Sequence, residues 1–426
     1  MATRTLEEWL DYQGQVHPAT MDFTLDRIGV VLDRLGIRQL KTPVITVGGT
    51  NGKGSVTAML ESIVQAGGGR VGLYTSPHLL RYQERIRLNG QEVDEAVLLS
   101  AFERIEAARG DITLTYFEYS TAAALLCFSE APLDLIVLEV GLGGRFDAVN
   151  AIDADVAVIV SVSLDHCDYL GTTLEAIGRE KAGIFRPNRP VILGCESMPA
   201  SVLKYAADIA APVHRLGHEF TAKAVGRSFH FAHGDVQCAD LPQPALQGAA
   251  QMGNAATALA ALNVIGLLPA PSAIAAGLTA VSLPGRYEVR PGPVRWIFDV
   301  AHNPGAARIL VDTLQADPCQ GRTIWVAGLL ADKDAAAVMR ELVTLLQPND
   351  VICAVSLSGE RGRSAADLTR VWQTVYPAPM VMAESVPAGC AFAAQEAVPG
   401  DRVVVFGSFH TVGPALDWHR LYSVNN

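Results

Sequence analysis

The sequence predicts an α/β protein of two domains, each built on a mostly parallel β-sheet. Short runs rich in valine and isoleucine alternate with helix-length segments along most of the chain. Strands that are apolar on both faces are typical of a parallel sheet covered by helices on both sides. With 426 residues, and roughly 150 residues per domain, the chain accommodates two domains, with three as the alternative.

The first sheet is predicted from five apolar runs: PVITVGG, RVGLYTSP, LDLIVLEVG, DVAVIVSVSLDH and RPVILG. Two intervening segments have helical periodicity, KGSVTAMLESIVQAG from Lys53 and DEAVLLSAFERIEAARG from Asp94. Both end at glycine, which is common just after a helix. This order of strand, helix and strand predicts a doubly wound sheet, whose ligands bind beyond the carboxyl ends of the strands.

The middle of the chain has a different pattern. Residues 205–245 contain shorter, more polar alternations that predict a small antiparallel excursion, and an alanine-rich helix is expected from Met252 to Leu268. The Pro-, Gly- and Arg-rich stretch at residues 283–295 is the candidate linker. We therefore expect domains at residues 1–288 and 289–426, with a cleft between them that excludes water.

The second domain is predicted from five more apolar runs: RWIFDVAHNP, RTIWVAGLL, DVICAVSL, APMVMAES and RVVVFGSFH. They alternate with helical segments, so a smaller, Rossmann-like α/β domain is expected here.

Composition and charge restrict the function. Half the residues are hydrophobic and 18% are charged, which fits a compact globular protein. A net charge of −11 repels nucleic acid, so any phosphate site must be built locally. No leader-like or membrane-spanning run occurs, and the seven cysteines lack metal-binding spacing. We expect a cytoplasmic protein with reduced thiols, no membrane partner and no zinc; Cys167 is expected to be a small buried hydrophobe.

The segment GGTNGKGS, residues 48–55, lies directly between a predicted strand and a predicted helix. Glycines let successive backbone N–H groups point at phosphate oxygens, the helix N-terminus adds positive potential, and a lysine reaches the outer phosphates. A glycine-rich turn with a solvated lysine is the alternative, and Gly54 separates Lys53 from Ser55 where the strict motif does not. The context favours an ATP site, which makes the first domain a P-loop ATPase domain. Its predicted ATP-binding residues are Thr50, Asn51, Gly52, Lys53, Gly54 and Ser55.

This loop resembles the P-loop variant of the Mur ligase family. The segments YTSPHLLRYQERIRLNG, LEVGLGGRFDAVN, SLDHCDYLG, EAIGREKAGIF, LPGRYE, FDVAHNP and GSFHTVG extend the resemblance to its dihydrofolate synthase and folylpolyglutamate synthase branch. They follow in the same order from about Leu6 to Gly413. The resemblance implies two domains, ATP, magnesium and amide formation to glutamate.

A metal site is predicted at the carboxyl edge of the first sheet. Ser76, Glu139 and His166 are each expected at a strand end beside the P-loop. Magnesium prefers oxygen ligands and retains waters and substrate phosphates, which suits a serine and one glutamate. A histidine is more often structural, and only the resemblance makes His166 a metal ligand. Two magnesium ions are implied, with a monovalent cation as a further candidate.

Lys181 resembles the family lysine that carbon dioxide converts to a carbamate beside the second metal. By itself, a lysine in this position is more often a surface residue at a turn. Carbamate formation requires the neutral amine, so burial or a nearby positive charge should lower the pKa of Lys181.

Further roles are implied by the resemblance alone. Asn254 would contact adenine, although such an asparagine is otherwise a helix cap. Arg286 and Asp299 would reach the nucleotide from the linker and the second domain. His302 and Ser408 would serve the incoming glutamate, although His302 could equally fix its own turn.

The segment TYFEYS resembles the part of the family that lines a dihydropteroate pocket. The residues implied are Thr115, Tyr116, Phe117, Glu118, Phe146, Asp147 and Ala148. Aromatic rings can stack on a pterin and a carboxylate can accept from its amino edge. An aromatic core cluster is the alternative, and on a strand Tyr116 and Phe117 would face opposite ways.

The expected enzyme uses ATP to activate a carboxylate as an acyl phosphate, which the amine of L-glutamate then attacks. Dihydropteroate and tetrahydrofolate are the expected acceptors, and a monomer is expected. The alternatives are a folate ligase without dihydropteroate activity, a ligase acting on a cell-wall nucleotide, and a nucleotide-regulated binding module without ligase activity. The combination of Glu139, His166 and Lys181 disfavours the binding module.

Overall fold

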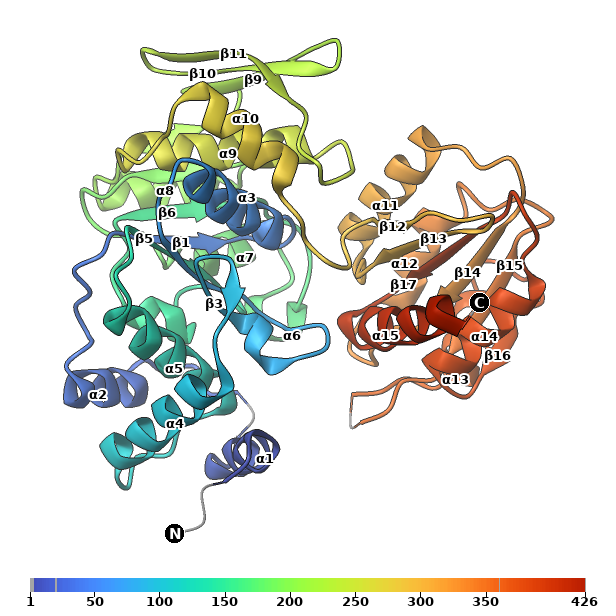
Figure 1. Ribbon diagram of the computed structural model, residues 1–426, viewed down its shortest axis with the longest axis horizontal. Helices are drawn as coiled ribbons and strands as arrows, with labels where there is room; N and C mark the ends of the chain where they lie inside the picture. Colours follow the sequence, from blue (N-terminus) through green and yellow to red (C-terminus); the bar gives the residue numbers. More distant parts are fainter. Residues whose placement is uncertain (1–3, 20, 360, 426) are drawn as a thin grey trace. The chain divides into compact units, whose positions relative to one another are not determined.

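The computed structural model describes residues 4–19, 21–359 and 361–425. The chain divides into two compact units, one of residues 1–245 with 251–281 and one of residues 246–250 with 282–426 (Figure 1). Both are α/β units with a mostly parallel main sheet, as predicted. Residues 282–288, expected in the first domain, belong to the second unit.

The main sheet of the first unit has eight strands in the order β4-β3-β2-β5-β1-β6-β7-β8. Its strands are β1 (Val44–Gly48), β2 (Val71–Tyr74), β3 (Ile86–Leu88), β4 (Gln91–Glu92), β5 (Leu135–Glu139), β6 (Val156–Ile159), β7 (Val191–Leu193) and β8 (Val213–Arg215). The five predicted runs form β1, β2, β5, β6 and β7, and these strands run parallel. The antiparallel β3 and β4, and the parallel edge strand β8, were not predicted.

Helices cover both faces of this sheet (Figure 1). They are α1 (Leu6–Val16), α2 (Asp26–Leu35), α3 (Lys53–Ala66), α4 (Glu95–Arg109), α5 (Tyr116–Glu130), α6 (Cys167–Leu170), α7 (Leu174–Ala182), α8 (Ala200–Asp208), α9 (Gln251–Val264) and α10 (Pro271–Ala280), with 3-10 turns η1 (Tyr82–Arg85) and η2 (Ala148–Ala151). The predicted helices from Lys53 and Asp94 are confirmed as α3 and α4. The apolar side chains of β1 and β5 are buried on both faces, which explains their uninterrupted hydrophobic sequence.

The predicted antiparallel excursion is confirmed as a separate sheet in the order β11-β10-β9. Its strands are β9 (Phe220–Val225), β10 (Ser228–His233) and β11 (Val236–Pro242). The alanine-rich helix that follows is α9, and it ends at Val264, before the expected Leu268. The excursion packs against α9 through β9 and β10.

The sheet of the second unit has the order β12-β13-β17-β14-β15-β16, and only β12 is antiparallel. Its elements are β12 (Glu288–Arg290), β13 (Arg295–Asp299), β14 (Thr323–Ala327), β15 (Val351–Val355), β16 (Val381–Ala383), β17 (Arg402–Phe406), α11 (Pro304–Ala316), α12 (Ala335–Leu342), α13 (Ala365–Gln373), α14 (Val386–Glu396) and α15 (Phe409–Asn425). The five predicted runs form β13 to β17.

The stretch at residues 283–295 is not a free linker, because β12 within it pairs with β13. No helix of the described residues is long and apolar enough to cross a membrane.

Candidate active site

The P-loop follows β1 and ends where α3 begins, in the predicted order of strand, loop and helix. Gly52 has φ +86°, and a Cβ placed there would lie 2.7 Å from Cγ1 of Val160. Gly49 has φ +145°, and its Cβ would lie 3.2 Å from the Val160 nitrogen. Left-handed backbone and lack of space together require glycine at both positions.

The P-loop is held by the segment that follows β6. The Thr50 nitrogen donates to the Ser161 carbonyl at 2.8 Å, and the Asn51 nitrogen donates to Ser161 Oγ at 3.0 Å. The Lys53 ammonium donates to the carbonyls of Gly49 at 3.0 Å and Thr50 at 3.2 Å. The lysine therefore lies over the loop. Gly54 and Ser55 form the buried first turn of α3.

Asn254 lies on α9 and is brought next to the P-loop, where the family resemblance places it. Only 6% of this residue is exposed, and its Oδ1 would lie 3.1 Å from a Cβ at Gly52. Its Nδ2 donates to Gln251 Oε1 at 3.0 Å.

Lys181 lies in the last turn of α7 and is 4% exposed, so it is not a surface lysine. Burial, followed by the positive charge of Lys53, lowers its pKa from 10.5 to about 7, against smaller opposing effects of Asp165 and Asp147. The prediction of a lowered pKa is confirmed. The influence of Lys53 also shows that Lys181 lies close to the P-loop.

Ser76 and Glu139 meet at the carboxyl ends of the neighbouring strands β2 and β5. The Ser76 nitrogen donates to Glu139 Oε2 at 3.3 Å, and Glu139 is 5% exposed. A buried carboxylate beside a serine supplies the oxygen ligands that magnesium prefers. Among the described residues, no group of three or more His, Cys, Asp and Glu side chains could hold a metal ion. The oxygens of Ser76 and Glu139 are of the kind that a magnesium ion takes together with water and phosphate oxygens.

His166 does not end a strand, which corrects the prediction. The strand β6 stops at Ile159, because the chain beyond it hydrogen-bonds to the P-loop through Ser161 and Ser163. His166 instead precedes α6 with φ +51°. Its backbone nitrogen donates to Asp165 Oδ1 at 2.9 Å.

The expected substrate segment, residues 115–118, is the start of helix α5. The strand geometry considered for Tyr116 and Phe117 therefore does not apply. Thr115 is the N-cap: its hydroxyl accepts from the Glu118 nitrogen at 3.2 Å, and its own nitrogen donates to Glu118 Oε2 at 2.8 Å. This reciprocal pair is a capping box, whose pattern of Thr followed three residues later by Glu is present in the sequence. Tyr116 and Phe117 consequently lie on the first helical turn.

Gly141, at the start of residues 141–148, lies against this turn. A Cβ at Gly141 would lie 2.6 Å from the ring of Phe117. Asp147 caps η2, accepts from the Leu142 nitrogen at 2.8 Å, and has its pKa raised to about 6 by burial. Ala148 is buried beside it, whereas Phe146 is 37% exposed and the guanidinium of Arg145 lies 4.8 Å from the centre of its ring.

The second unit brings its own predicted residues together. Asp299 ends β13 and accepts from the nitrogens of Tyr287 and Ala301, each at 2.8 Å. Burial raises its pKa, while the charges of Arg286 and His302 act in the opposite direction. The His302 ring also bonds the Val300 carbonyl at 2.8 Å, so this histidine does fix its own turn.

Ser408 follows β17, the parallel neighbour of β13. It is buried, its Oγ lies 2.8 Å from Thr411 Oγ1, and it accepts from the Thr411 nitrogen at 3.1 Å. The guanidinium of Arg286 lies 5.1 Å from the ring of Phe409. Arg286, Asp299, His302 and Ser408 thus gather at one edge of the second sheet.

Sequence reasoning missed two charged residues of the first unit. Asp165 acts on Lys181 and directly precedes His166, so its place in SLDH was the available signal. Arg85 is buried, donates to His78 Nδ1 at 2.8 Å, and lies 5.5 Å from the ring of Tyr116. Both belong to segments that carry the family resemblance.

Two models of known protein families match this chain. The Mur ligase middle domain matches residues 47–262, and the Mur ligase glutamate ligase domain matches residues 285–409. A dihydrofolate synthase/folylpolyglutamate synthase of Escherichia coli strain K12 is 44% identical over 98% of this chain and 96% of its own length.

Solved structures agree along the whole chain. An Escherichia coli enzyme in complex with DHPP and ADP has a TM-score of 0.93 and 42% identity, covering 99% of both chains. A bifunctional folylpolyglutamate synthase/dihydrofolate synthase with Mn, AMPPNP and L-glutamate bound has a TM-score of 0.90 and 41% identity, covering 100% of this chain and 99% of its own. With the P-loop, the paired Ser76 and Glu139, and the buried Lys181, these matches establish that the chain belongs to the Mur ligase family, in its dihydrofolate synthase/folylpolyglutamate synthase branch.

Proposed function

We propose that this protein is an ATP-dependent ligase that joins L-glutamate to dihydropteroate, forming dihydrofolate, and to tetrahydrofolate and its glutamylated forms. ATP and a divalent metal are the expected cofactors, since relatives of this branch have been solved with AMPPNP, ADP and Mn. The observation that carries the proposal is a buried lysine with a pKa of about 7 next to the lysine of a phosphate loop.

The P-loop binds the phosphates of ATP through its backbone N–H groups and Lys53, and Asn254 contacts the adenine. The pteroate carboxylate attacks the γ-phosphorus, and the bond to the β-phosphate oxygen breaks, so ADP leaves. The amine of glutamate then attacks the acyl carbon and loses a proton, and inorganic phosphate departs with one former carboxylate oxygen.

Both reactants of the first step are anions, so the site must reduce their repulsion. Magnesium, at two positions, would neutralise the phosphates and the attacking carboxylate. Ser76, Glu139 and His166 are the residues proposed to hold it, with Lys181 as a carbamate; a monovalent cation is a further candidate. Lys53 places a fixed positive charge at the same phosphates.

The dihydropteroate pocket is proposed at the first turn of α5 and the facing residues 146–148. Thr115 to Glu118 and Asp147 supply polar groups, while Phe117 and Phe146 supply aromatic surface. In the second unit, Arg286 and Asp299 are proposed to act on the nucleotide, and His302 and Ser408 on glutamate. We also propose that the chain works as a monomer.

A phosphate-release assay tests the function. With ATP and Mg²⁺, release should require both dihydropteroate and L-glutamate, and ¹⁸O in the pteroate carboxylate should appear in the released phosphate. Activity with a UDP-muramoyl substrate alone would refute the proposal, and ATP binding without release for any pterin would favour the binding module. Replacing dihydropteroate with tetrahydrofolate tests the second activity.

A further inference from the structure

A chain of polar contacts through His17, Asp22 and Arg27 joins both ends of residues 113–118. His17 Nδ1 lies 2.8 Å from Thr113 Oγ1, and His17 Nε2 lies 3.2 Å from Asp22 Oδ2. Asp22 Oδ2 also accepts from Arg27 Nη1 at 2.6 Å. Arg27 Nη2 completes the chain at 3.2 Å from both carboxylate oxygens of Glu118.

Glu118 is engaged within the protein. It is 3% exposed, accepts from Arg27 and from the Thr115 nitrogen, and closes the capping box of α5. A buried carboxylate needs a counter-charge. The Glu118 carboxylate also interacts favourably with the N-terminus of α5, but only while the first turn of the helix keeps its geometry. Arg27 therefore fixes the carboxylate that fixes the start of α5.

Arg27 fixes a second segment at the same time. Its bond to Asp22 anchors the chain before α2, where Phe23 is 42% exposed and its ring lies 5.8 Å from the ring of Tyr169. Tyr169 lies on α6, the helix that His166 precedes. One guanidinium thus links α2, the first turn of α5 and, through Phe23, the region of His166.

We propose that Arg27 is a positioning residue for the dihydropteroate pocket, acting through Glu118 on the first turn of α5. This inference rests on the proposed function, since it assigns that pocket to residues 115–118. The planar shape of the Arg27 guanidinium matters as well as its charge, because its two terminal nitrogens each hold a different carboxylate, that of Asp22 and that of Glu118.

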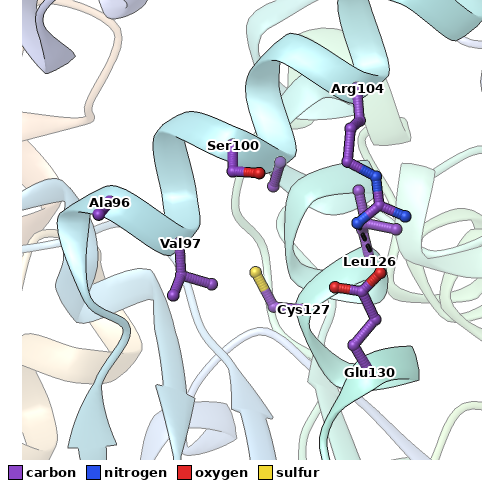
Figure 2. Close-up of a pocket in the computed structure, with 8 residues that line it drawn as sticks. Ala96, Val97, Ser100, Arg104, Leu126, Cys127 and Glu130 are labelled. Atoms are coloured by element: carbon purple, nitrogen blue, oxygen red, sulfur yellow. Dashed lines mark hydrogen bonds and ion pairs between the residues drawn. The ribbon is translucent and has the colours of Figure 1, made fainter.

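The chain offers a matched control at the other end of the same helix. Arg104 of α4 forms an ion pair with Glu130 in the last turn of α5 (Figure 2). Arg27→Ala and Arg104→Ala each remove an arginine paired with a glutamate of α5, but only the first touches the start of the helix. Arg104→Ala should change the KM for dihydropteroate and the KM for ATP by no more than about twofold each, because exposed ion pairs contribute little to stability.

The test is initial-rate phosphate release, with KM measured separately for dihydropteroate and ATP. Arg27→Ala should raise the KM for dihydropteroate about tenfold or more, because a buried charged hydrogen bond is lost, and leave the KM for ATP within about twofold. Arg27→Lys keeps the charge and loses the fork, so its KM should rise about threefold. It also serves as the test variant if Arg27→Ala does not fold.

An unchanged KM for dihydropteroate in a folded Arg27 variant would overturn the inference. An equal rise in both KM values would also overturn it, because that pattern indicates a general structural role. If the wild-type protein releases no phosphate with dihydropteroate and glutamate, the proposed function itself fails and this inference falls with it.

Discussion

Removing carbon dioxide should inactivate this protein if Lys181 is carbamylated. Burial and Lys53 together lower the pKa of Lys181 from 10.5 to about 7. At pH 7, about half of the Lys181 amine is then neutral, against about one part in 3000 for an ordinary lysine. The neutral amine is the form that attacks carbon dioxide, so the environment increases its supply by about three orders of magnitude.

The electrostatics favour the product as well as the reaction. Holding Lys181 charged costs about 5 kcal/mol at low pH, as estimated from the same fall from 10.5 to about 7. A carbamate would replace this buried cation with an anion facing Lys53, so repulsion would become attraction. As the pH falls from 7 to 6, the neutral fraction drops about fivefold, and the carbamate should decrease with it.

The assay follows phosphate release in sealed buffer freed of carbon dioxide, with and without added bicarbonate. Activity should fall on depletion and recover with bicarbonate. With ¹³C-bicarbonate, a carbamate resonance should appear in the wild type and in Lys204→Ala, and be absent from Lys181→Ala. Lys204 is a suitable control because its side chain is 75% exposed and pairs with Asp208. Full activity after depletion, with no resonance that depends on Lys181, would refute the reasoning.

Three further predictions follow from backbone geometry and from the contact between a half-buried and a buried histidine. Gly52→Ala should raise the KM for ATP about tenfold or more, because the added Cβ clashes with Val160. Gly68 has a similar φ of +84° but nothing within 4 Å, so Gly68→Ala should leave the KM for ATP unchanged. Equal effects of the two substitutions would point to backbone strain alone. Gly277→Ala places a Cβ 2.5 Å from the backbone of α3 and should lower stability by about 1–3 kcal/mol in urea unfolding; an unchanged midpoint would contradict the clash. His214 and His233 share a 2.9 Å contact, and burial lowers both pKa values below 6.5. The unfolded chain then binds these protons more readily, so stability should be full above about pH 6.5 and fall below it. Urea midpoints at pH 7.5 and 5.5 check this, and His233→Phe should reduce the difference; a difference that stays the same would assign it to other groups.

The strands and the phosphate loop were predictable because their causes are local. A strand buried on both faces must be apolar at every position, so runs such as LDLIVLEVG identified β5 without knowledge of its neighbours. The P-loop needs glycine at Gly52 and a helix beginning at Lys53, and both requirements are present in consecutive residues. The short strands β3, β4 and β12 carried no such signal, because their pairing depends on partners as much as on their own side chains.

The start of α5 shows how a local signal can be overlooked. Thr115 and Glu118 have the spacing of a capping box, yet Tyr116 and Phe117 between them were considered only as they would lie on a strand. His166 was misplaced for a different reason. The hydrogen bonds that end β6 go to the P-loop, which is more than a hundred residues earlier in the chain.

The sequence by itself therefore determined the buried parallel strands of the two main sheets, the phosphate loop and the family, since each is identified by short runs of consecutive residues. Only the tertiary structure decided the chemical state of the site. The pKa of Lys181 depends on burial and on Lys53, and the bond from Ser76 to Glu139 depends on two strands becoming neighbours. Charge and solvation act through space, so groups distant in sequence set the reactivity of each side chain.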